Sequence, residues 1–267
     1  MTQRASQTEK AERFRALHEG ETFVMPNPWD AGSAKVLAAL GFEALATTSS
    51  GFAFTLGRRD GDVTLEELAG HIAAVDAATD LPLSVDLENG YGPDPEDAAR
   101  AITVAGESGA VGGSIEDYGA EEGLYEISHA TERIAAAVEA ARSLDFPFTL
   151  TARAENFFRG NPDLDDTIAR LQAYEEAGAD VVYAPRLGDI EQVRTIAEAT
   201  TKPLNVLVHP RLTVAEIIEA GGQRISVGGN LAWVAAAAFA EAAETIRDEG
   251  DFAPLWVKVK MDEWLSG

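Results

Sequence analysis

Eight short apolar runs of β-strand character alternate with alanine-rich helical stretches, and this alternation is the strongest constraint on how the chain can fold. No Pro/Ser-rich linker or low-complexity block interrupts the series. The predicted strands are Phe23–Met25, Ala44–Thr48, Leu83–Asp86, Gly113–Ile115, Thr149–Ala152, Val181–Ala184, Leu204–Val206 and Ile225–Val227. The predicted helices are Gly32–Leu40, Leu65–Ala78, Pro95–Ala105, His129–Leu144, Leu164–Ala177, Ile190–Ala199, Val214–Ala220 and Leu231–Asp248.

The ends of these helices carry capping signals. Thr64 and Thr213 each precede a helix with glutamate in its first turn, which predicts an N-cap at both positions. A glycine follows several helices directly, where a left-handed C-cap is needed before the next strand. These glycines are Gly41, Gly109, Gly178 and Gly221.

Eight parallel strands joined by crossover helices close most simply as a (β/α)8 TIM barrel, an α/β fold whose sites lie on the loops after the strands. A length of 267 residues suits one such barrel, so we expect residues 1–267 to form a single catalytic domain. A doubly wound open sheet is the alternative, and the lack of a Gly-x-Gly-x-x-Gly turn speaks against it. A predicted helical tail at about 251–264 should need a partner surface. Its apolar residues are Phe252, Leu255, Trp256, Val257, Val259, Met261 and Trp264.

The charge balance restricts the partners of the protein. With 45 acidic and 21 basic residues the net charge is −24, which repels nucleic acids and anionic membranes, so we expect neither as a partner. The chain has no apolar run of signal-peptide length at its start and none that could span a bilayer, so we expect a cytoplasmic protein. The absence of cysteine agrees with this and excludes thiolate nucleophiles, disulfides and cysteine-bound zinc.

Two acidic pairs follow neighbouring predicted strands. Asp86 and Glu88 are two residues apart, so on an extended backbone they point the same way, into the glycine-rich loop 89–92. The next predicted strand ends in a second pair, Glu116 and Asp117. Converging carboxylates need a cation, and oxygen-only ligands favour a hard ion, Mg²⁺ or alternatively Mn²⁺. Such a site leaves room for a small anionic carboxylic acid as substrate.

Polar groups follow two further strands. The run 47–51, Thr-Thr-Ser-Ser-Gly, combines hydroxyls with backbone N–H groups that suit a substrate carboxylate or phosphonate, although an ordinary turn explains it equally well. The fifth predicted strand is followed by Arg153, whose guanidinium can bind an anion bidentately at the barrel rim. Beside a carboxylate cluster, this arginine is better explained by function than by a solvated surface role.

Seven motifs together resemble the isocitrate lyase and phosphoenolpyruvate mutase superfamily, and more closely its short bacterial members. They are Pro26–Ala34, Thr48–Gly51, Asp86–Gly92, Ile115–Asp117, Thr151–Arg153, Gly178–Asp180 and Arg224–Gly229. The resemblance implies a (β/α)8 barrel, usually with the last helix swapped between the subunits of a dimer or tetramer, which would explain the apolar tail. It also implies a Mg²⁺-dependent lyase or mutase acting on α-keto or α-hydroxy acids.

By position, the resemblance also implies roles for single residues. Asp86, Glu88 and Glu116 would hold Mg²⁺ directly or through water, and Arg153 would bind the oxyanion side of the substrate. A chelated α-keto acid would then react through a pyruvate enolate that the metal stabilises. The implied substrate-binding residues are Trp29, Ser50, Gly51, Phe52, Arg153 and Asn205.

Departures from the family narrow the chemistry. Glu88 stands where the family has aspartate, and the segment 117–125 lacks the Lys-Lys-Cys-Gly-His motif that supplies an acid/base cysteine. Tyr118 stands where the phosphonate enzymes have lysine. We therefore expect a catalytic set of Arg153, Tyr118 and Asp60, the last being the acidic residue near the metal, and His209 as a further side chain that could reach the site.

The leading hypothesis is a Mg²⁺-dependent carbon–carbon lyase or decarboxylase, similar to oxaloacetate decarboxylase, acting on a small α-keto or α-hydroxy dicarboxylic acid. One alternative is a phosphorus–carbon bond enzyme acting on phosphonopyruvate. Another is a non-catalytic keto-acid binding protein that kept the barrel and lost the loop. In each case we expect a homodimer or homotetramer.

Overall fold

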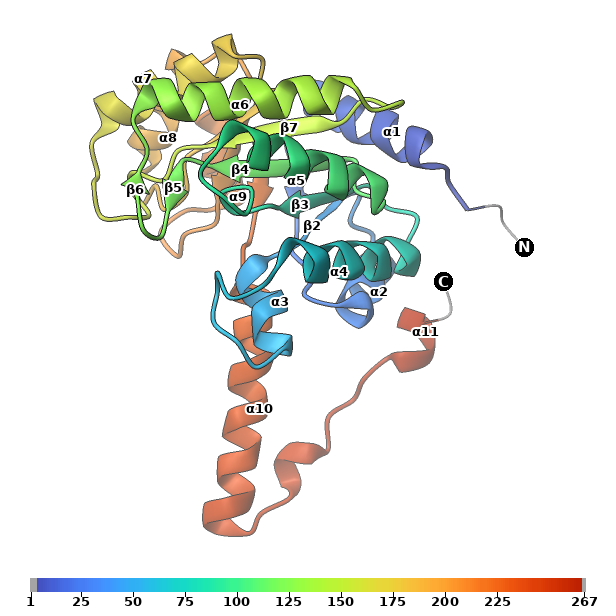
Figure 1. Cartoon of the computed structure of the whole chain (residues 1–267). Coiled ribbons are helices and arrows are strands. Elements are labelled where there is room, and N and C mark those ends of the chain that lie inside the picture. The colour runs from blue at the N-terminus through green and yellow to red at the C-terminus, as the bar shows by residue number, and fades with distance from the viewer. Residues whose placement is uncertain (1–3, 266–267) are drawn as a thin grey trace.

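The computed structural model describes residues 4–265, and its core is a barrel of parallel strands surrounded by helices (Figure 1). The barrel strands are β1 (Phe23–Met25), β2 (Leu45–Ala46), β3 (Leu83–Asp86), β4 (Gly112–Glu116), β7 (Thr149–Arg153), β8 (Val181–Tyr183), β9 (Leu204–Leu207) and β10 (Gly222–Ser226). The helices are α1 (Gln7–Glu19), α2 (Ala31–Ala39), α3 (Ser49–Thr55), α4 (Leu65–Ala78), α5 (Pro95–Glu107), α6 (Ile127–Arg142), α7 (Leu164–Glu176), α8 (Ile190–Ala199), α9 (Val214–Glu219), α10 (Asn230–Glu249) and α11 (Met261–Leu265), with a 3-10 turn, η1 (Ala253–Leu255). A small antiparallel ribbon of β5 (Tyr118–Gly119) and β6 (Gly123–Leu124) follows β4.

The barrel strands are hydrogen-bonded in the order β1-β10-β9-β8-β7-β4-β3-β2, and every pair is parallel. The two ends of this order meet where the Ala46 N–H donates to the Pro26 carbonyl at 3.1 Å, so the sheet is nearly closed. The predicted (β/α)8 barrel is confirmed, and the open doubly wound sheet is wrong. In the register of β4 and β7, Glu116 lies beside Arg153, which brings the carboxyl ends of these strands to one level.

The predicted capping signals are also confirmed. Thr64 and Thr213 each accept a hydrogen bond from the backbone N–H three residues on, and the glutamate there returns the bond. All four predicted exit glycines have positive φ, a conformation that other residues rarely adopt. Strands β1 and β3 and helices α4 and α8 have the predicted bounds, and the ends of the others differ by up to three residues.

Two helices were not predicted. Helix α1 begins with a capping box between Ser6 and Glu9 and buries Phe14 against Phe23 at the amino ends of the strands, where it covers the bottom of the barrel. Helix α3 follows β2 directly, in the segment for which a turn or an anion-binding loop was the expectation. Its N-cap is Thr48, whose side chain accepts a hydrogen bond from the backbone N–H of the third helical residue.

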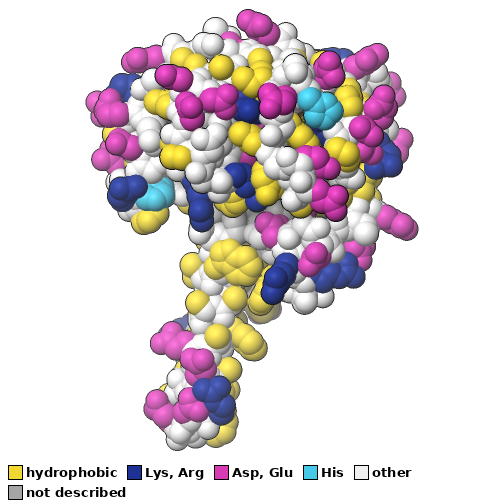
Figure 2. All heavy atoms as spheres, turned by 60° about the vertical axis from the view of Figure 1, so that its left-hand side comes forward, with side chains coloured by type: hydrophobic (Ala, Val, Ile, Leu, Met, Phe, Trp, Pro, Cys, Tyr) yellow, Lys and Arg dark blue, Asp and Glu magenta, His cyan; other side chains and the backbone are white. Residues whose placement is uncertain are grey.

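Helix α10 extends away from the barrel, and the following chain returns to place α11 beside α2 (Figures 1 and 2). Only Ala232 of this helix is buried, whereas Phe239 is 75% exposed and Trp256, in the following segment, is 85% exposed. The predicted swap of this helix between subunits stays a prediction. Within residues 4–265 no helix combines the length and hydrophobicity needed to cross a membrane.

Candidate active site

A cavity of about 860 Å³ opens at the carboxyl ends of the strands and extends into the barrel. It extends this far because several strand residues that line it are small, such as Ala46, Ser84 and Ser114. The structure brings nine of the predicted site residues to its wall. They are Ser50, Asp60, Asp86, Glu88, Glu116, Tyr118, Arg153, Asn205 and His209.

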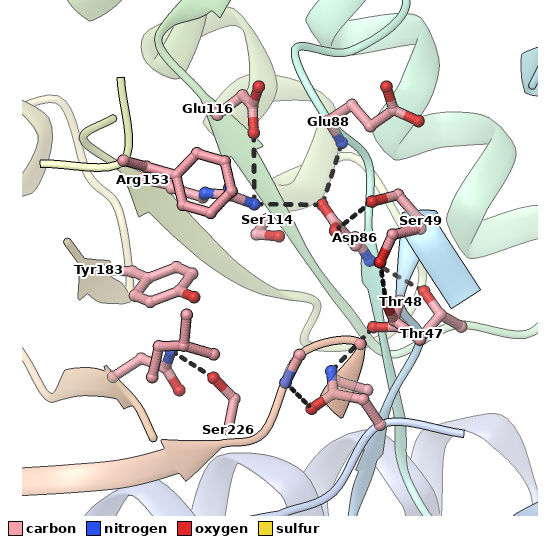
Figure 3. Close-up of a pocket in the computed structure, with 18 of the residues that line it drawn as sticks. Thr47, Thr48, Ser49, Asp86, Glu88, Ser114, Glu116, Arg153, Tyr183 and Ser226 are labelled. Carbon is pink, nitrogen blue, oxygen red and sulfur yellow. Dashed lines mark hydrogen bonds and ion pairs between the residues drawn. The ribbon is translucent and has the colours of Figure 1, made fainter. Parts of the chain in front are cut away.

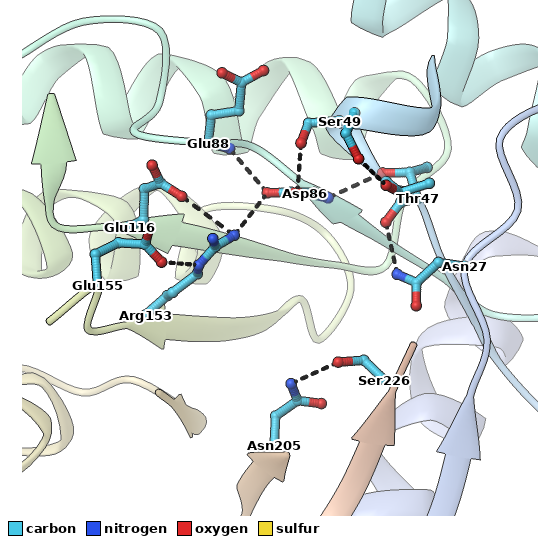
Figure 4. Close-up of polar contacts among 12 residues, drawn as sticks. Asn27, Thr47, Ser49, Asp86, Glu88, Glu116, Arg153, Glu155, Asn205 and Ser226 are labelled. Carbon is cyan, nitrogen blue, oxygen red and sulfur yellow. Dashed lines mark hydrogen bonds and ion pairs between the residues drawn. The ribbon is translucent and has the colours of Figure 1, made fainter. Parts of the chain in front are cut away.

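Arg153, the last residue of β7, lies at the centre of a cluster of carboxylates (Figures 3 and 4). Its guanidinium is 3.2 Å from a Glu116 oxygen, 3.6 Å from an Asp86 oxygen and 2.5 Å from a Glu155 oxygen. The ring of Tyr183 lies 5.5 Å from the guanidinium carbon. Arg153 is therefore fixed on several sides, at the ends of three adjacent strands.

The carboxylates of this cluster carry more negative charge than its arginines balance. Burial, followed by the charges of Asp86 and Asp60, raises the pKa of Glu88 from 4.5 to about 8. Burial also raises the pKa of Glu116 to about 8, although Arg153 opposes the rise. The pKa of Asp60 is raised mainly by desolvation of its carboxyl group, although the residue as a whole is exposed at the rim. Protons or a cation must offset this excess charge.

The donor set fits a hard divalent cation. Asp86, Glu88 and Glu116 offer only oxygen atoms. A bound cation would relieve the repulsion among these three carboxylates and the raised pKa values of Glu88 and Glu116. Their carboxylates are not gathered into one compact group, and the described part of the chain contains no cluster of three or more histidine, aspartate or glutamate side chains that could hold a metal ion. Arg153 stands between Asp86 and Glu116 instead.

Three predicted substrate-binding residues do not line the cavity, namely Trp29, Gly51 and Phe52. The backbone N–H groups of Gly51 and Phe52 donate to Thr48 within the first turn of α3, at 3.4 Å and 3.0 Å. The Phe52 ring stacks on His71 with 3.9 Å between centroids. The backbone N–H groups of Gly51 and Phe52, which were expected to bind a substrate carboxylate, are therefore already hydrogen-bonded within helix α3.

The two residues of the second acidic pair, Glu116 and Asp117, have different roles. Glu116 faces the cavity, whereas Asp117 is buried and accepts hydrogen bonds from the Tyr174 hydroxyl at 2.6 Å and from Arg170 at 3.1 Å. It also accepts from the backbone N–H of Glu155 at 2.8 Å. Asp117 is thus a structural residue that holds α7 and the segment after β7 together.

Sequence reasoning missed the side chains that support Arg153. Glu155 is fully buried, and Arg159 lies 2.9 Å from it and 3.0 Å from Glu116. The same Arg159 guanidinium lies 3.7 Å from the centre of the Tyr118 ring and holds that ring at the cavity. The i, i+4 spacing of Glu155 and Arg159 was a usable signal for their ion pair.

Two of the predicted residues, His209 and Asn205, lie on the other side of the cavity. His209 lines it, with its Nδ1 accepting a hydrogen bond from the Arg211 backbone N–H at 3.3 Å. Asn205 lies deeper, on β9, next to Ser226 of β10. Arg186, which was not predicted, also lines the cavity and has a positive φ of 65°.

Comparisons with known proteins agree with this architecture. The sequence pattern of the phosphoenolpyruvate phosphomutase family matches residues 14–247. A protein of Burkholderia cenocepacia J2315, provisionally assigned as a lyase/mutase, is 47% identical with a TM-score of 0.94, and the match covers 98% of this chain and 97% of that one. Oxaloacetate acetylhydrolase, solved with its product oxalate, is 27% identical with a TM-score of 0.86, covering 96% and 94%. The 2-methylisocitrate lyase of Halalkalibacterium halodurans is 30% identical over 258 residues, covering 92% and 84%.

Proposed function

This chain belongs to the phosphoenolpyruvate mutase/isocitrate lyase superfamily, and from that premise we propose that it is a Mg²⁺-dependent carbon–carbon lyase or decarboxylase. Its substrate would be a small α-keto or α-hydroxy dicarboxylic acid that reacts through an enolate. The observation that carries the proposal is the meeting of Asp86, Glu116 and Arg153 in one cavity, at the ends of adjacent strands.

In this proposal Asp86, Glu88 and Glu116 hold the metal. When bound, Mg²⁺ supplies a Lewis acid that stabilises negative charge on the substrate oxygen. Arg153 binds the same developing oxyanion, and the buried Glu155 keeps its guanidinium in place so that little reorganisation is needed during the reaction.

Binding of the substrate carboxylate falls to hydroxyl groups at the start of α3. Ser50 lines the cavity, and its Oγ lies 3.2 Å from the Thr48 hydroxyl. Ser49 donates to Asp86 at 3.0 Å, which orients that carboxylate. The Ser50 hydroxyl is thereby fixed by Thr48, and the Asp86 carboxylate by Ser49, before substrate enters.

Proton transfer falls to Tyr118 and Asp60. Asp60, with its raised pKa, accepts the proton of a substrate hydroxyl in the cleavage of an α-hydroxy acid. Tyr118, held against Arg159, delivers a proton to the enolate carbon. A phenol is a weaker acid than the cysteine of related lyases, so we expect slower turnover than a cysteine would give.

We also propose that the protein works as a homodimer or homotetramer in which α10 packs on a second copy. The exposed apolar residues of α10 and the tail support this assembly. Trp233 of α10 lines the cavity, so a second copy bound to this helix would lie close to the active site.

The test measures the α-keto acid released from four compounds, with Mg²⁺ and then with a chelator. The product is pyruvate from oxaloacetate, methylisocitrate and phosphonopyruvate, and glyoxylate from isocitrate. We expect chelator-sensitive turnover of at least one of the three carboxylic acids, namely oxaloacetate, isocitrate and methylisocitrate. Turnover of phosphonopyruvate alone would replace the proposal with phosphorus–carbon chemistry. Binding of keto acids without turnover of any compound would favour a binding protein.

Asp86→Ala should abolish metal-dependent turnover without unfolding the protein, because it removes one carboxylate from a cluster with excess negative charge. The matched control is Asp62→Ala, an exposed aspartate on the loop after α3, which should keep full turnover. Circular dichroism and thermal melting check the fold of both variants. A full rate in Asp86→Ala would end the metal assignment.

A further inference from the structure

The inner end of the cavity has a floor of hydrogen-bonded side chains from β7, β9 and β10, namely Thr151, Asn205, Arg224 and Ser226, of which Asn205, Arg224 and Ser226 line the cavity. All four are buried, and Arg224 is 2% exposed. Its Nε donates to Asn205 Oδ1 at 2.8 Å, and one Nη donates to Thr151 Oγ1 at 2.9 Å. Figure 3 labels Ser226 at this end of the cavity, opposite the carboxylate cluster.

Arg224 differs from Arg153 in its charge balance. Arg153 has three carboxylate partners, whereas the described residues provide no carboxylate within ion-pair distance of Arg224. A buried cation without a counter-charge is costly to keep and attracts an anion. The inner end of the cavity is therefore positive, while the metal end is negative.

The contact of Arg224 with His18 does not neutralise the charge of the guanidinium. His18 Nδ1 lies 2.8 Å from the Phe14 carbonyl oxygen, which can only accept, so Nδ1 carries the proton. His18 Nε2, 3.2 Å from Arg224, is then the acceptor on a neutral ring. Arg224 gains a hydrogen bond from this contact and no opposite charge.

Arg224 also decides which way the Asn205 amide points. A guanidinium has only donors, so Asn205 must present its carbonyl oxygen to Arg224. Its NH₂ group is turned to the other side, where one hydrogen donates to Ser226 Oγ at 3.0 Å (Figure 4). Among the residues that the structure describes, the second hydrogen has no acceptor, so it is left as a donor at the cavity wall.

We infer that Arg224 is a positioning and specificity-determining residue. It holds Asn205 so that the amide NH₂ group of Asn205 faces the cavity, and its own charge makes the inner end of the cavity positive. The inner end therefore binds the second carboxylate of a dicarboxylic substrate. This inference rests on the proposed function and deepens it, because it assigns the remote end of the substrate to a site. The metal and Arg153 serve the other end.

The test compares two inert ligands that differ only at one end, succinate and its monoamide succinamate. Calorimetry in the presence of Mg²⁺ gives their affinities for the full-length protein. We expect the wild type to prefer succinate by roughly tenfold or more, since a hydrogen bond to a charged group is worth more than one to a neutral group. Equal affinities, or no binding of either ligand, would overturn the inference.

Asn205→Asp is the decisive variant. The new carboxylate would pair with Arg224, so the thermal midpoint should stay the same or rise, while the preference for succinate should disappear through like-charge repulsion. Asn230→Asp makes the same change at the exposed rim of the cavity and should keep most of the preference. A lower midpoint in Asn205→Asp, or an unchanged preference, would contradict an uncompensated Arg224.

Arg224→Lys separates charge from positioning. Lysine keeps the charge and cannot reproduce the planar guanidinium that holds the Asn205 amide. We expect succinate still to be preferred, but both ligands to bind several-fold more weakly. Wild-type affinity for both would refute the positioning role. These binding measurements need no turnover, so they are independent of the proposed function. A preference for succinate without catalysis would refute the proposed function alone. Turnover without the preference would refute this inference alone.

Discussion

Lowering the pH from 7 to 5 should destabilise the protein through His18, at the bottom of the barrel. This imidazole accepts a hydrogen bond from Arg224, and its protonation would place an N–H group against the guanidinium. Burial, and next the charge of Arg224, lower the pKa of His18 from 6.5 to about 3. The folded protein therefore resists a proton that the unfolded chain accepts readily.

The sign and size follow from these two pKa values. Because the pKa is lower in the folded state, the contribution to stability is fully present above pH 6.5 and is lost progressively as the pH falls toward 3. Between pH 7 and pH 5 the difference in proton binding amounts to a loss of about 2 kcal/mol in the free energy of unfolding.

Urea denaturation of the wild type and of His18→Gln at both pH values measures this effect. Glutamine keeps an acceptor for Arg224 and does not titrate. Glu88 and Glu116, with pKa values of about 8, add their own pH dependence to both proteins, so only the difference between the proteins isolates His18. The variant should lose about 2 kcal/mol less than the wild type. Equal losses would refute a neutral, buried imidazole.

Three further predictions concern the site and the assembly. Mg²⁺ binding at pH 7 should release protons and tighten as the pH rises from 6 to 8, because the raised pKa of Glu88 keeps its carboxyl group largely protonated before the cation binds. Calorimetry in buffers of different ionisation enthalpy measures this, and no proton release would contradict the raised pKa of Glu88. Glu155→Gln should lower the free energy of unfolding, measured by urea denaturation, by about 3–5 kcal/mol, because it removes a buried carboxylate shared by Arg153 and Arg159. The exposed control Glu191→Gln should change it by no more than about 0.5 kcal/mol. Equal stabilities of the two variants would show that the ion pairs of Glu155 do not stabilise the fold. Phe239→Glu should lower the molar mass seen by light scattering, and an unchanged oligomer would exclude α10 as the interface.

The barrel could be predicted from sequence because its signals are local. Periodic apolar residues, threonine caps and exit glycines each act within a few residues, and together they determine where strands and helices begin and end. Helix α1 escaped prediction because it is polar on most faces and buries only Lys10, Ala11 and Phe14. Helix α3 escaped because its hydroxyl and glycine residues also suit a turn, and the stacking of Phe52 on His71 that accompanies the helix is a tertiary contact.

The carboxylate and arginine cluster could be predicted because its side chains stand at strand ends, whereas Ser50, Asp60 and Tyr118 were predicted from the resemblance to the family. Asp86, Glu116 and Arg153 reach the cavity because β3, β4 and β7 are adjacent and in register. Asp117 is next to Glu116 in sequence and faces the opposite way, so its buried contact with Tyr174 could not be read from the acidic pair. The contacts of the supporting residues depend on which segments meet in three dimensions, and spacing alone does not determine that.

Charge is divided along the cavity, and this division discriminates between the two reactions within the proposed function. In the inference above, the inner end of the cavity binds the second carboxylate of the substrate beside Arg224 and so stabilises its negative charge. Decarboxylation of that group must remove this charge, because the group leaves as neutral CO₂. An interaction that is stronger in the ground state than in the transition state does not accelerate a reaction. Cleavage of a carbon–carbon bond that leaves this carboxylate intact loses nothing there, while the enolate charge still forms at Arg153 and the metal end. A floor that carries Arg224 therefore favours the lyase reaction over decarboxylation of the bound carboxylate.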